Sequence, residues 1–250
     1  MKILQNTFLL VSLLVATASS AFAQAYSGER KFDGVHYNEV NGSLFGGQNV
    51  VTGAFFGENA IYTRHLSPRW SISAGQQIQF LKNVFSIDIM GTYRIPVGKK
   101  VNIYIDGRFM FSRYQHWKVN EPVVNLSAYL ETNYFDLRWG WSYIRYHKVD
   151  VNEQYKSFTT ASYGEPLVMT LQLGVNIRPR GNRWNLGLFF RNFDQYYYEN
   201  WNINWGVRFY CTLPLDMKLF GELNIRPAGS LSQLATRYET SLKLGLKYAW

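Results

Sequence analysis

Basic side chains stand on the polar side of many segments whose residues alternate between polar and apolar types. In residues 101–112, Asp106 and Arg108 fall on one side and Ile103 and Ile105 on the other. Arg and Lys gathered around one passage favour the transit of anions. The basic residues at such positions are Arg64, Arg94, Arg108, Arg138, Arg178, Arg191, Arg208, Lys218, Arg226, Lys243 and Lys247. The acidic ones, which are fewer, are Glu58, Asp88, Asp106, Glu131, Glu222 and Glu239.

A second chemistry, hydrolysis by an activated serine, requires a nucleophile and a base within hydrogen-bond reach. Ser112, His116, His147 and Asp150 are the residues of the right types near two polar segments. The alternative is that these histidines are ordinary polar surface. No His, Cys, Asp or Glu cluster has metal-ligand spacing, and no Gly-rich phosphate loop is present, so we expect no metal and no cofactor.

The C-terminal segment shows best which element positions such residues. Its even positions form an apolar face, and its odd positions, among them Lys243 and Lys247, form a polar face. Successive side chains of a β-strand point to opposite sides, so the pattern is typical of a strand between lipid and a polar interior. The apolar face consists of Tyr238, Leu242, Leu244, Leu246, Tyr248 and Trp250, with Thr240 between them.

The same alternation recurs along most of the chain, and no segment shows a helical period of useful length. It occupies residues 70–80, 85–95, 101–112, 124–132, 137–143, 167–178, 184–191, 201–213 and 217–226. Arg or Lys on a lipid-facing wall costs ~2–4 kcal/mol at the midplane. We therefore expect the charged residues named above to line the interior of a barrel.

Short connections with Pro, Gly or Asp alternate with longer polar ones, as periplasmic turns and outer loops do in outer-membrane barrels. If the last strand runs toward the periplasm, the strand at residues 50–65, eleventh from the end, also runs toward it. An even strand number then requires one more strand at residues 35–45, closed by a turn at 46–49. The prediction is an all-β, antiparallel, up-and-down transmembrane barrel of twelve strands. The alternative is ten strands, with residues 24–48 as a plug or a periplasmic tail.

Residues 1–23 have the features of a cleaved signal peptide: Lys2, a short apolar stretch and an Ala21-Phe22-Ala23 cleavage site. The mature chain, residues 24–250, has the length of one domain, and residues 24–34 are expected to be a periplasmic segment. Beyond the signal no apolar run is long enough for a membrane helix. The single cysteine, Cys211, cannot form an intramolecular disulfide.

Aromatic residues make up 17% of the chain, and Tyr and Trp gather at the outer limits of membrane strands. We expect one group to anchor the barrel at the membrane interfaces: Trp70, Trp139, Trp141, Trp184, Trp201 and Trp205. The formal net charge of +9 favours anions, acidic polysaccharide or lipopolysaccharide phosphates as partners. Nucleic acid is excluded as a partner, because an export signal is present and no binding motif is.

Together, the alternation, the two kinds of connection and the terminal aromatic resemble the outer-membrane β-barrel proteins of Gram-negative bacteria, in composition those of Bacteroidetes. The resemblance implies location in the bacterial outer membrane among lipids and lipopolysaccharide. It also implies delivery by periplasmic chaperones and recognition of the strand from Tyr238 to Trp250 by the barrel assembly machinery. Some members of the class hydrolyse lipids, but no motif here matches them. We expect a monomer.

Three functions remain open at this level. The first is a small channel for small, anionic solutes, which the basic residues favour. The second is a closed barrel that binds a surface partner through its outer loops, with the interior charges joined in an ion-pair network because buried charges need partners. The third, a lipid-modifying hydrolase, has the least support.

Overall fold

The computed structural model describes residues 37–49, 53–80, 84–98, 101–115, 119–145, 147–148, 167–192, 203–226 and 239–250. Several sequence predictions lie outside these residues: the signal peptide, the segment 24–34, His116, Asp150, Trp201 and Tyr238. In the described ranges there is no helix long and apolar enough to cross a membrane.

Twelve long strands follow one another along the chain, and a thirteenth strand of only two residues, β8, lies between β7 and β9. They are β1 (Asn38–Asn49), β2 (Gly53–His65), β3 (Trp70–Gln79), β4 (Val84–Pro96), β5 (Val101–Tyr114), β6 (Val119–Thr132), β7 (Phe135–Ile144), β8 (His147–Lys148), β9 (Leu167–Asn176), β10 (Trp184–Arg191), β11 (Asn204–Thr212), β12 (Met217–Arg226) and β13 (Glu239–Ala249). All pairings are antiparallel, and β8 pairs only with the start of β6.

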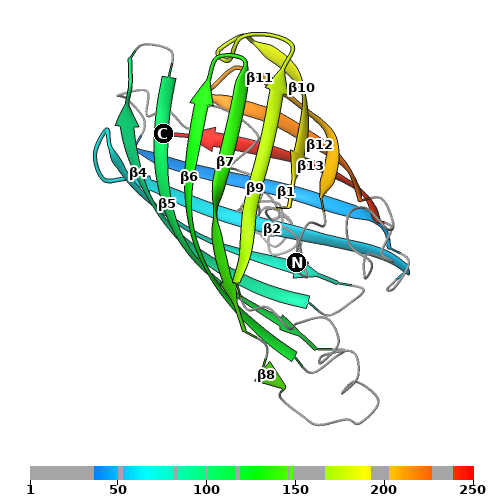
Figure 1. Ribbon diagram of the computed structural model, residues 1–250. Coiled ribbons are helices and arrows are strands. Elements are labelled where there is room, and N and C mark those ends of the chain that lie inside the picture. The colour runs from blue at the N-terminus through cyan, green and yellow to red at the C-terminus, as the bar shows by residue number, and fades with distance from the viewer. Residues whose placement is uncertain are drawn as a thin grey trace, which may run out of the picture.

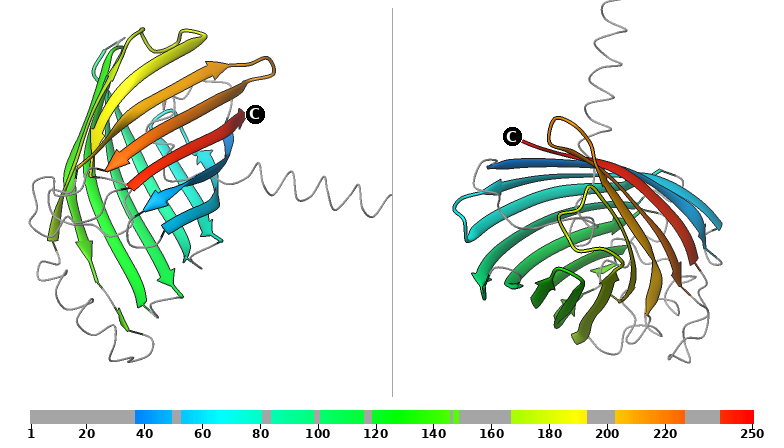
Figure 2. Two further views of the ribbon diagram at one scale, coloured as in Figure 1. Left: turned by 90° about the vertical axis from the view of Figure 1, so that its right-hand side faces the viewer. Right: turned by 90° about the horizontal axis from the view of Figure 1, so that it is seen from above.

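The sheet closes on itself because β1 pairs with β13 (Figures 1 and 2). At that seam, the Asn38 amide donates to the Trp250 carbonyl and the Trp250 amide donates to the Asn38 carbonyl, each at 3.0 Å. Closure leaves no unpaired sheet edge, which a strand structure in lipid requires. The twelve-strand barrel predicted from the sequence is therefore confirmed, and the ten-strand alternative is wrong.

The first strand begins and ends later than predicted. Residues 46–49 continue β1 and pair with both β2 and β13, so the predicted turn at this place is wrong. A Cβ atom added at Gly47 would collide with the carbonyl oxygen of Thr240 and the Cα atom of Ser241. The close approach of β13 thus explains why residue 47 is glycine. In the sequence, the same glycine suggested a turn.

Side chains alternate between a polar interior and an apolar exterior. On β7, Arg138 and Ser142 are fully buried inside, whereas Trp139 and Trp141 are 55% and 45% exposed outside. Trp70, Trp184 and Trp205 are also exposed on outward positions. An apolar exterior around a polar interior is the arrangement of a transmembrane barrel.

We call the end that carries the connections 66–69, 133–134, 177–183 and 213–216 the turn end, and the opposite end the loop end. On β13 the predicted apolar face points outward, with Leu242, Leu244, Tyr248 and Trp250 exposed and Leu246 half-buried. At the turn end, the Trp250 ring stacks on Tyr248 at 5.5 Å between centroids and lies 6.4 Å from Tyr62.

The assignment of the two faces predicts opposite results for two Leu→Arg changes. Leu173 is exposed on the lipid-facing side of β9, and Leu215 is 80% exposed in a turn outside the wall. Leu173→Arg should lower the free energy of unfolding by about 2–4 kcal/mol, because it places a charge in hydrocarbon. Leu215→Arg should change it by less than about 0.5 kcal/mol. Urea unfolding in phospholipid vesicles measures both, and equal losses would contradict the assignment.

The seam predicts a special role for the terminal residue. Trp250→Ala removes the ring that packs on Tyr248 and Tyr62 beside the closing hydrogen bonds. We expect a several-fold lower level of folded barrel in cells, read as heat-modifiable migration on a gel, because an open seam exposes two sheet edges. Trp184→Ala, an outward aromatic away from the seam, is the control. The idea fails if both variants assemble like the unmodified chain.

Candidate functional site

Asp136, at the start of β7, is the centre of the charged interior. Its side chain is fully buried and accepts hydrogen bonds from the Arg180 Nη2 atom at 2.5 Å, from the Gln172 Nε2 atom at 2.5 Å and from Arg208. Since β9 and β10 separate β7 from β11 in the sheet, the contact with Arg208 joins two walls of the barrel. One carboxylate thus bridges the lumen near the turn end.

Arg180 reaches this centre from the turn 177–183 between β9 and β10. Its guanidinium also donates to Glu131 at 3.0 Å and to the carbonyl oxygen of Thr132 at 3.0 Å. Burial by itself lowers the pKa of Arg180, but Tyr129, Glu131 and Asp136 together hold that pKa above its ordinary value. The residue therefore stays charged and closes part of the turn end of the lumen.

Two further ion pairs extend the network along β4, β5 and β7. Arg138 pairs with Asp106 at 2.7 Å, with neither side chain exposed, and Arg108 pairs with Asp88 at 2.9 Å. The Arg138 guanidinium also lies 5.0 Å from the centre of the Tyr129 ring. Buried charges with partners of this kind are compatible with the low dielectric of a barrel wall.

The opposite part of the wall, β10 to β13 and β1, holds a second set of pairs. Arg191 donates to Glu222 at 2.9 Å, and Lys243 stands opposite Glu222 on the neighbouring strand. The Lys247 Nζ atom lies 2.6 Å from Glu39 on β1. The His65 Nε2 atom is 3.3 Å from the same carboxyl group.

The balance of charge differs between the two walls of the lumen. On β4 to β7, three basic side chains, Arg94, Arg108 and Arg138, stand among five acidic ones, namely Asp88, Asp106, Glu121, Glu131 and Asp136. Basic side chains prevail on β10 to β13, namely Arg191, Arg208, Lys218, Lys243 and Lys247, with Glu222 among them. We call this second group the basic wall. An anion inside the barrel would be attracted more strongly to the basic wall than to β4 to β7, whose acids are mostly paired with Arg.

The structure places most predicted lumen residues on inward positions. Buried there are Asp88, Asp106, Arg108, Glu131, Arg138, Arg191, Arg208, Glu222 and Lys247, while Arg94, Lys218 and Lys243 are half-buried. Three predicted positions are wrong. Glu58 and Arg64 lie on the outward face of β2, and exposed Arg178 lies with its guanidinium 3.5 Å from the centre of the Trp184 ring. The side chains of Arg226 and Glu239 lie outside the described part.

The two predictions on β2 are wrong because its charged residues share the outward face with the apolar Phe56 and Tyr62. Phe55, Asn59, Ile61, Thr63 and His65 are the inward residues, so the face is opposite to the one that the charges suggested. A shift of one residue exchanges the two faces of a strand.

Sequence reasoning missed four charged lumen residues, and all of them lie near strand ends. Glu121 and Asp136 were placed in connections, although β6 begins at Val119 and β7 at Phe135. Glu39 lies in the strand with the weakest alternation, and Arg180 lies in a turn, where a periodic pattern gives no signal. The pairing of neighbouring strands shows two of them to be inside, because it aligns Asp136 with buried Glu131 and Glu121 with buried Ser112.

Of the four residues considered for hydrolysis, Ser112 is the one whose side chain the structure describes. Ser112 is fully buried in the lumen and accepts a hydrogen bond from the Ser86 hydroxyl at 2.8 Å. His147 belongs to β8, and its side chain is outside the described set, as are His116 and Asp150. Within the residues that the structure describes, no group of three His, Cys, Asp or Glu side chains could hold a metal ion.

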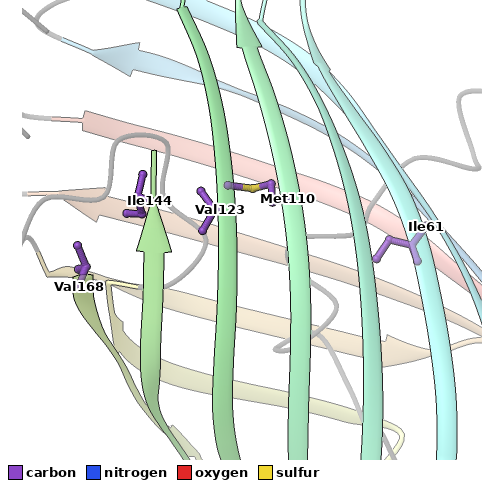
Figure 3. Close-up of a cluster of buried hydrophobic side chains, with 5 residues drawn as sticks. All are labelled: Ile61, Met110, Val123, Ile144 and Val168. Atoms are coloured by element: carbon purple, nitrogen blue, oxygen red, sulfur yellow. The ribbon is translucent and has the colours of Figure 1, made fainter. Parts of the chain in front are cut away.

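Apolar side chains also occur inside the barrel. Ile61, Met110, Val123, Ile144 and Val168 form a buried cluster, with the last four toward the loop ends of their strands (Figure 3). The ion-pair network lies on the turn-end side of these four residues. A solute that enters from the loop end would thus pass these apolar side chains, and Glu121 beside them on β6, before it reaches the network around Asp136.

Comparison with known proteins supports the fold alone. No protein-family model matches the chain, and no curated protein is similar to it in sequence. The KdgM porin in complex with disordered oligogalacturonate aligns with a TM-score of 0.51 and 10% identity, over 85% of this chain and 99% of the porin. The KdgM porin by itself aligns with a TM-score of 0.51 and 8% identity, over 85% of this chain and 99% of the porin. The outer membrane phospholipase A from Escherichia coli aligns with a TM-score of 0.48 and 10% identity, over 93% of this chain and 97% of the enzyme. This TM-score is too low to bear on activity here. The KdgM likeness confirms the outer-membrane barrel fold predicted from the sequence.

The central position of Asp136 predicts a large loss of stability when its charge is removed. Asp136→Asn leaves Arg208 facing a neutral amide and weakens the contact with Arg180. Breaking a buried ion pair by changing one partner costs about 3–5 kcal/mol, and Arg180 keeps Glu131, so we expect about 3 kcal/mol. Asp216→Asn, the same change in an exposed turn, should cost less than about 0.5 kcal/mol. Equal unfolding midpoints in urea for the two variants would show that the network is not structural.

Proposed function

We propose that this barrel is a channel for small, anionic solutes in the bacterial outer membrane. The observation that carries the proposal is the basic wall on β10 to β13, in which Glu222 is the one acidic residue among the described side chains. In a lumen with low-dielectric walls, such a stripe concentrates anions and provides successive weak binding positions along their path.

Neutral hydrogen-bonding groups beside the basic wall point to hydroxyl-rich anions as substrates. The Oε1 atom of Gln172 and the Nδ2 atom of Asn176 are buried and have no hydrogen-bond partner. The Oδ1 atom of Asn176 accepts a hydrogen bond from Arg208 at 3.2 Å. A solute with a carboxylate for Arg208 and hydroxyl groups for the two amides would satisfy all three residues.

The likeness to the KdgM porin supports the same class of solute. The KdgM structure is a complex with oligogalacturonate, a chain of sugar acids that combines carboxylates with hydroxyl groups. The shared feature is the barrel fold, since the sequences are only 10% identical. For the present chain, the choice of an anionic sugar rests on the basic wall and the two amides.

A closed barrel with a surface-binding role is the second candidate, and the bridge through Asp136 favours it. Arg208, Arg180 and Gln172 all converge on this carboxylate. These contacts cross part of the lumen near the turn end. Conduction by the first mechanism therefore requires that a passing anion compete with Asp136 for Arg208, whereas the second mechanism needs no such exchange.

Planar-bilayer measurements test the proposal. In a salt gradient, the reversal potential should indicate a preference for anions over cations. The double change Lys218→Gln, Lys243→Gln should reduce this anion preference several-fold, because the basic wall loses two charges. Arg64→Gln removes one charge from the outward face and should leave the preference unchanged. Cation selectivity of the unmodified barrel would refute the basic-wall mechanism.

An additional variant distinguishes the two candidates if the unmodified barrel shows no current. Asp136→Ala removes the bridge between β7 and β11. A current that appears only in this variant identifies the bridge as the block and supports a closed barrel. Conduction by the unmodified chain, with a higher current in Asp136→Ala, supports the channel.

A further inference from the structure

The outward face of β1 to β3 carries a carboxylate where a transmembrane barrel presents apolar side chains to lipid. Glu58 lies in the middle part of β2 between the outward residues Phe56 and Ala60. Its neighbours on the adjacent strands are Leu44 and Ile78. Phe56 and Leu44 are exposed, as expected for residues in contact with lipid.

Glu58 has no compensating contact among the residues that the structure describes. Among the described residues, no hydrogen bond or ion pair involves Glu58 or Gln76, the other polar residue at the middle of this face. An ionisable side chain inside the hydrocarbon region is costly, and it indicates a functional contact with a named partner. Gln76 stands opposite Ala60, two residues from Glu58 along the ladder, so both groups belong to one small area.

Small residues surround these two polar groups. Gly42, Gly46, Ala54, Ala60 and Ala74 are all on outward positions of β1, β2 and β3. On the other side of the barrel, β9 to β11 present Leu173, Leu188, Phe190 and Trp205 at such positions. Membrane proteins use small residues where two protein surfaces approach closely and polar residues where they form hydrogen bonds across the contact.

We propose that the outward face of β1 to β3 binds a second copy of this chain within the membrane. In a two-fold contact the same patch meets itself, so each feature occurs twice. The Gln76 amide of one copy can donate to the Glu58 carboxylate of the other, and the reverse. The patch supplies both donor and acceptor, and it needs no charged group from elsewhere.

The chemistry of the patch favours a second copy over lipid. A carboxylate is repelled by the anionic phosphates of lipopolysaccharide, and hydrocarbon chains offer it no donor. The alternative partner is a different membrane protein that carries a basic residue, and the size of a cross-linked product distinguishes it from a second copy. The sequence predicted a monomer and placed Glu58 in the lumen. Because Glu58 lies on the outward face, we propose a dimer in place of that monomer. This dimer does not depend on what the barrel transports.

Site-specific cross-linking in outer membranes tests this contact. In a Cys211→Ala background, Ala60→Cys places one thiol in the centre of the patch, and Leu188→Cys places one at an outward position of β10 as the control. With a short bis-maleimide, the Ala60→Cys protein should give a covalent dimer and the Leu188→Cys protein should not. Absence of a dimer from Ala60→Cys, or an adduct with another protein in its place, would overturn the proposal.

Leucine variants then test whether the polar groups hold the two copies together. In the Ala60→Cys background, Glu58→Leu and Gln76→Leu should each lower the dimer yield, by about tenfold for the loss of two symmetric hydrogen bonds. Both changes suit a lipid-facing position, so heat-modifiable migration should show that the barrels remain folded. A folded Glu58→Leu barrel that cross-links as efficiently as its parent would refute the role of the carboxylate.

Discussion

The absence of water in a bilayer is the constraint on which this structure depends. Every backbone amide and carbonyl of a strand in lipid must find its partner in another strand, so the sheet has to close. Here closure is achieved by eleven residues of β1 in register with β13, from Glu39 opposite Ala249 to Asn49 opposite Glu239. A Cβ atom at Gly47 would collide with β13 across that seam, and Trp250 is hydrogen-bonded to Asn38 at its other end.

Closure in turn determines where charge can lie. Each strand has one face toward lipid and one toward the lumen, so polar residues gather in a narrow interior and must satisfy one another. The network around Asp136 is the result: three donors from three parts of the chain meet one carboxylate. The same contacts that stabilise the barrel cross part of its lumen between β7 and β11, so the proposed transport includes an exchange of partners at Arg208.

The exterior follows the opposite rule, and its exceptions are therefore informative. Arg64 and Arg178 lie near the turn end, where Arg64 donates to Asn38 at 2.6 Å and Arg178 lies over the Trp184 ring. Water and headgroups are close at that level, so the two charges need no further partner. For Glu58, neither kind of contact occurs within the part of the chain that the structure describes. This difference is why the outward face of β1 to β3, and not the turn-end rim, suggests a protein contact.

The sequence by itself determined the fold class, the strand number and the direction of most side chains. These properties follow from a period of two that persists along β4 to β13 and from turns that alternate with longer connections. Such patterns are local, because they depend only on consecutive residues, such as those from Leu242 to Trp250. They were sufficient to place Asp106, Arg138 and Glu222 inside the barrel.

Only the tertiary structure decided which charges meet and which strand faces are reversed. Arg180 and Asp136 are far apart in sequence and lie in or beside turns, where alternation carries no information, so their contact depends on the pairing of β7 with β9. Glu58 was misplaced because register is a property of two neighbouring strands, and β2 is aligned by β1 and β3 rather than by its own charges. Local periodicity predicts a wall, whereas the contacts across that wall depend on how the sheet closes.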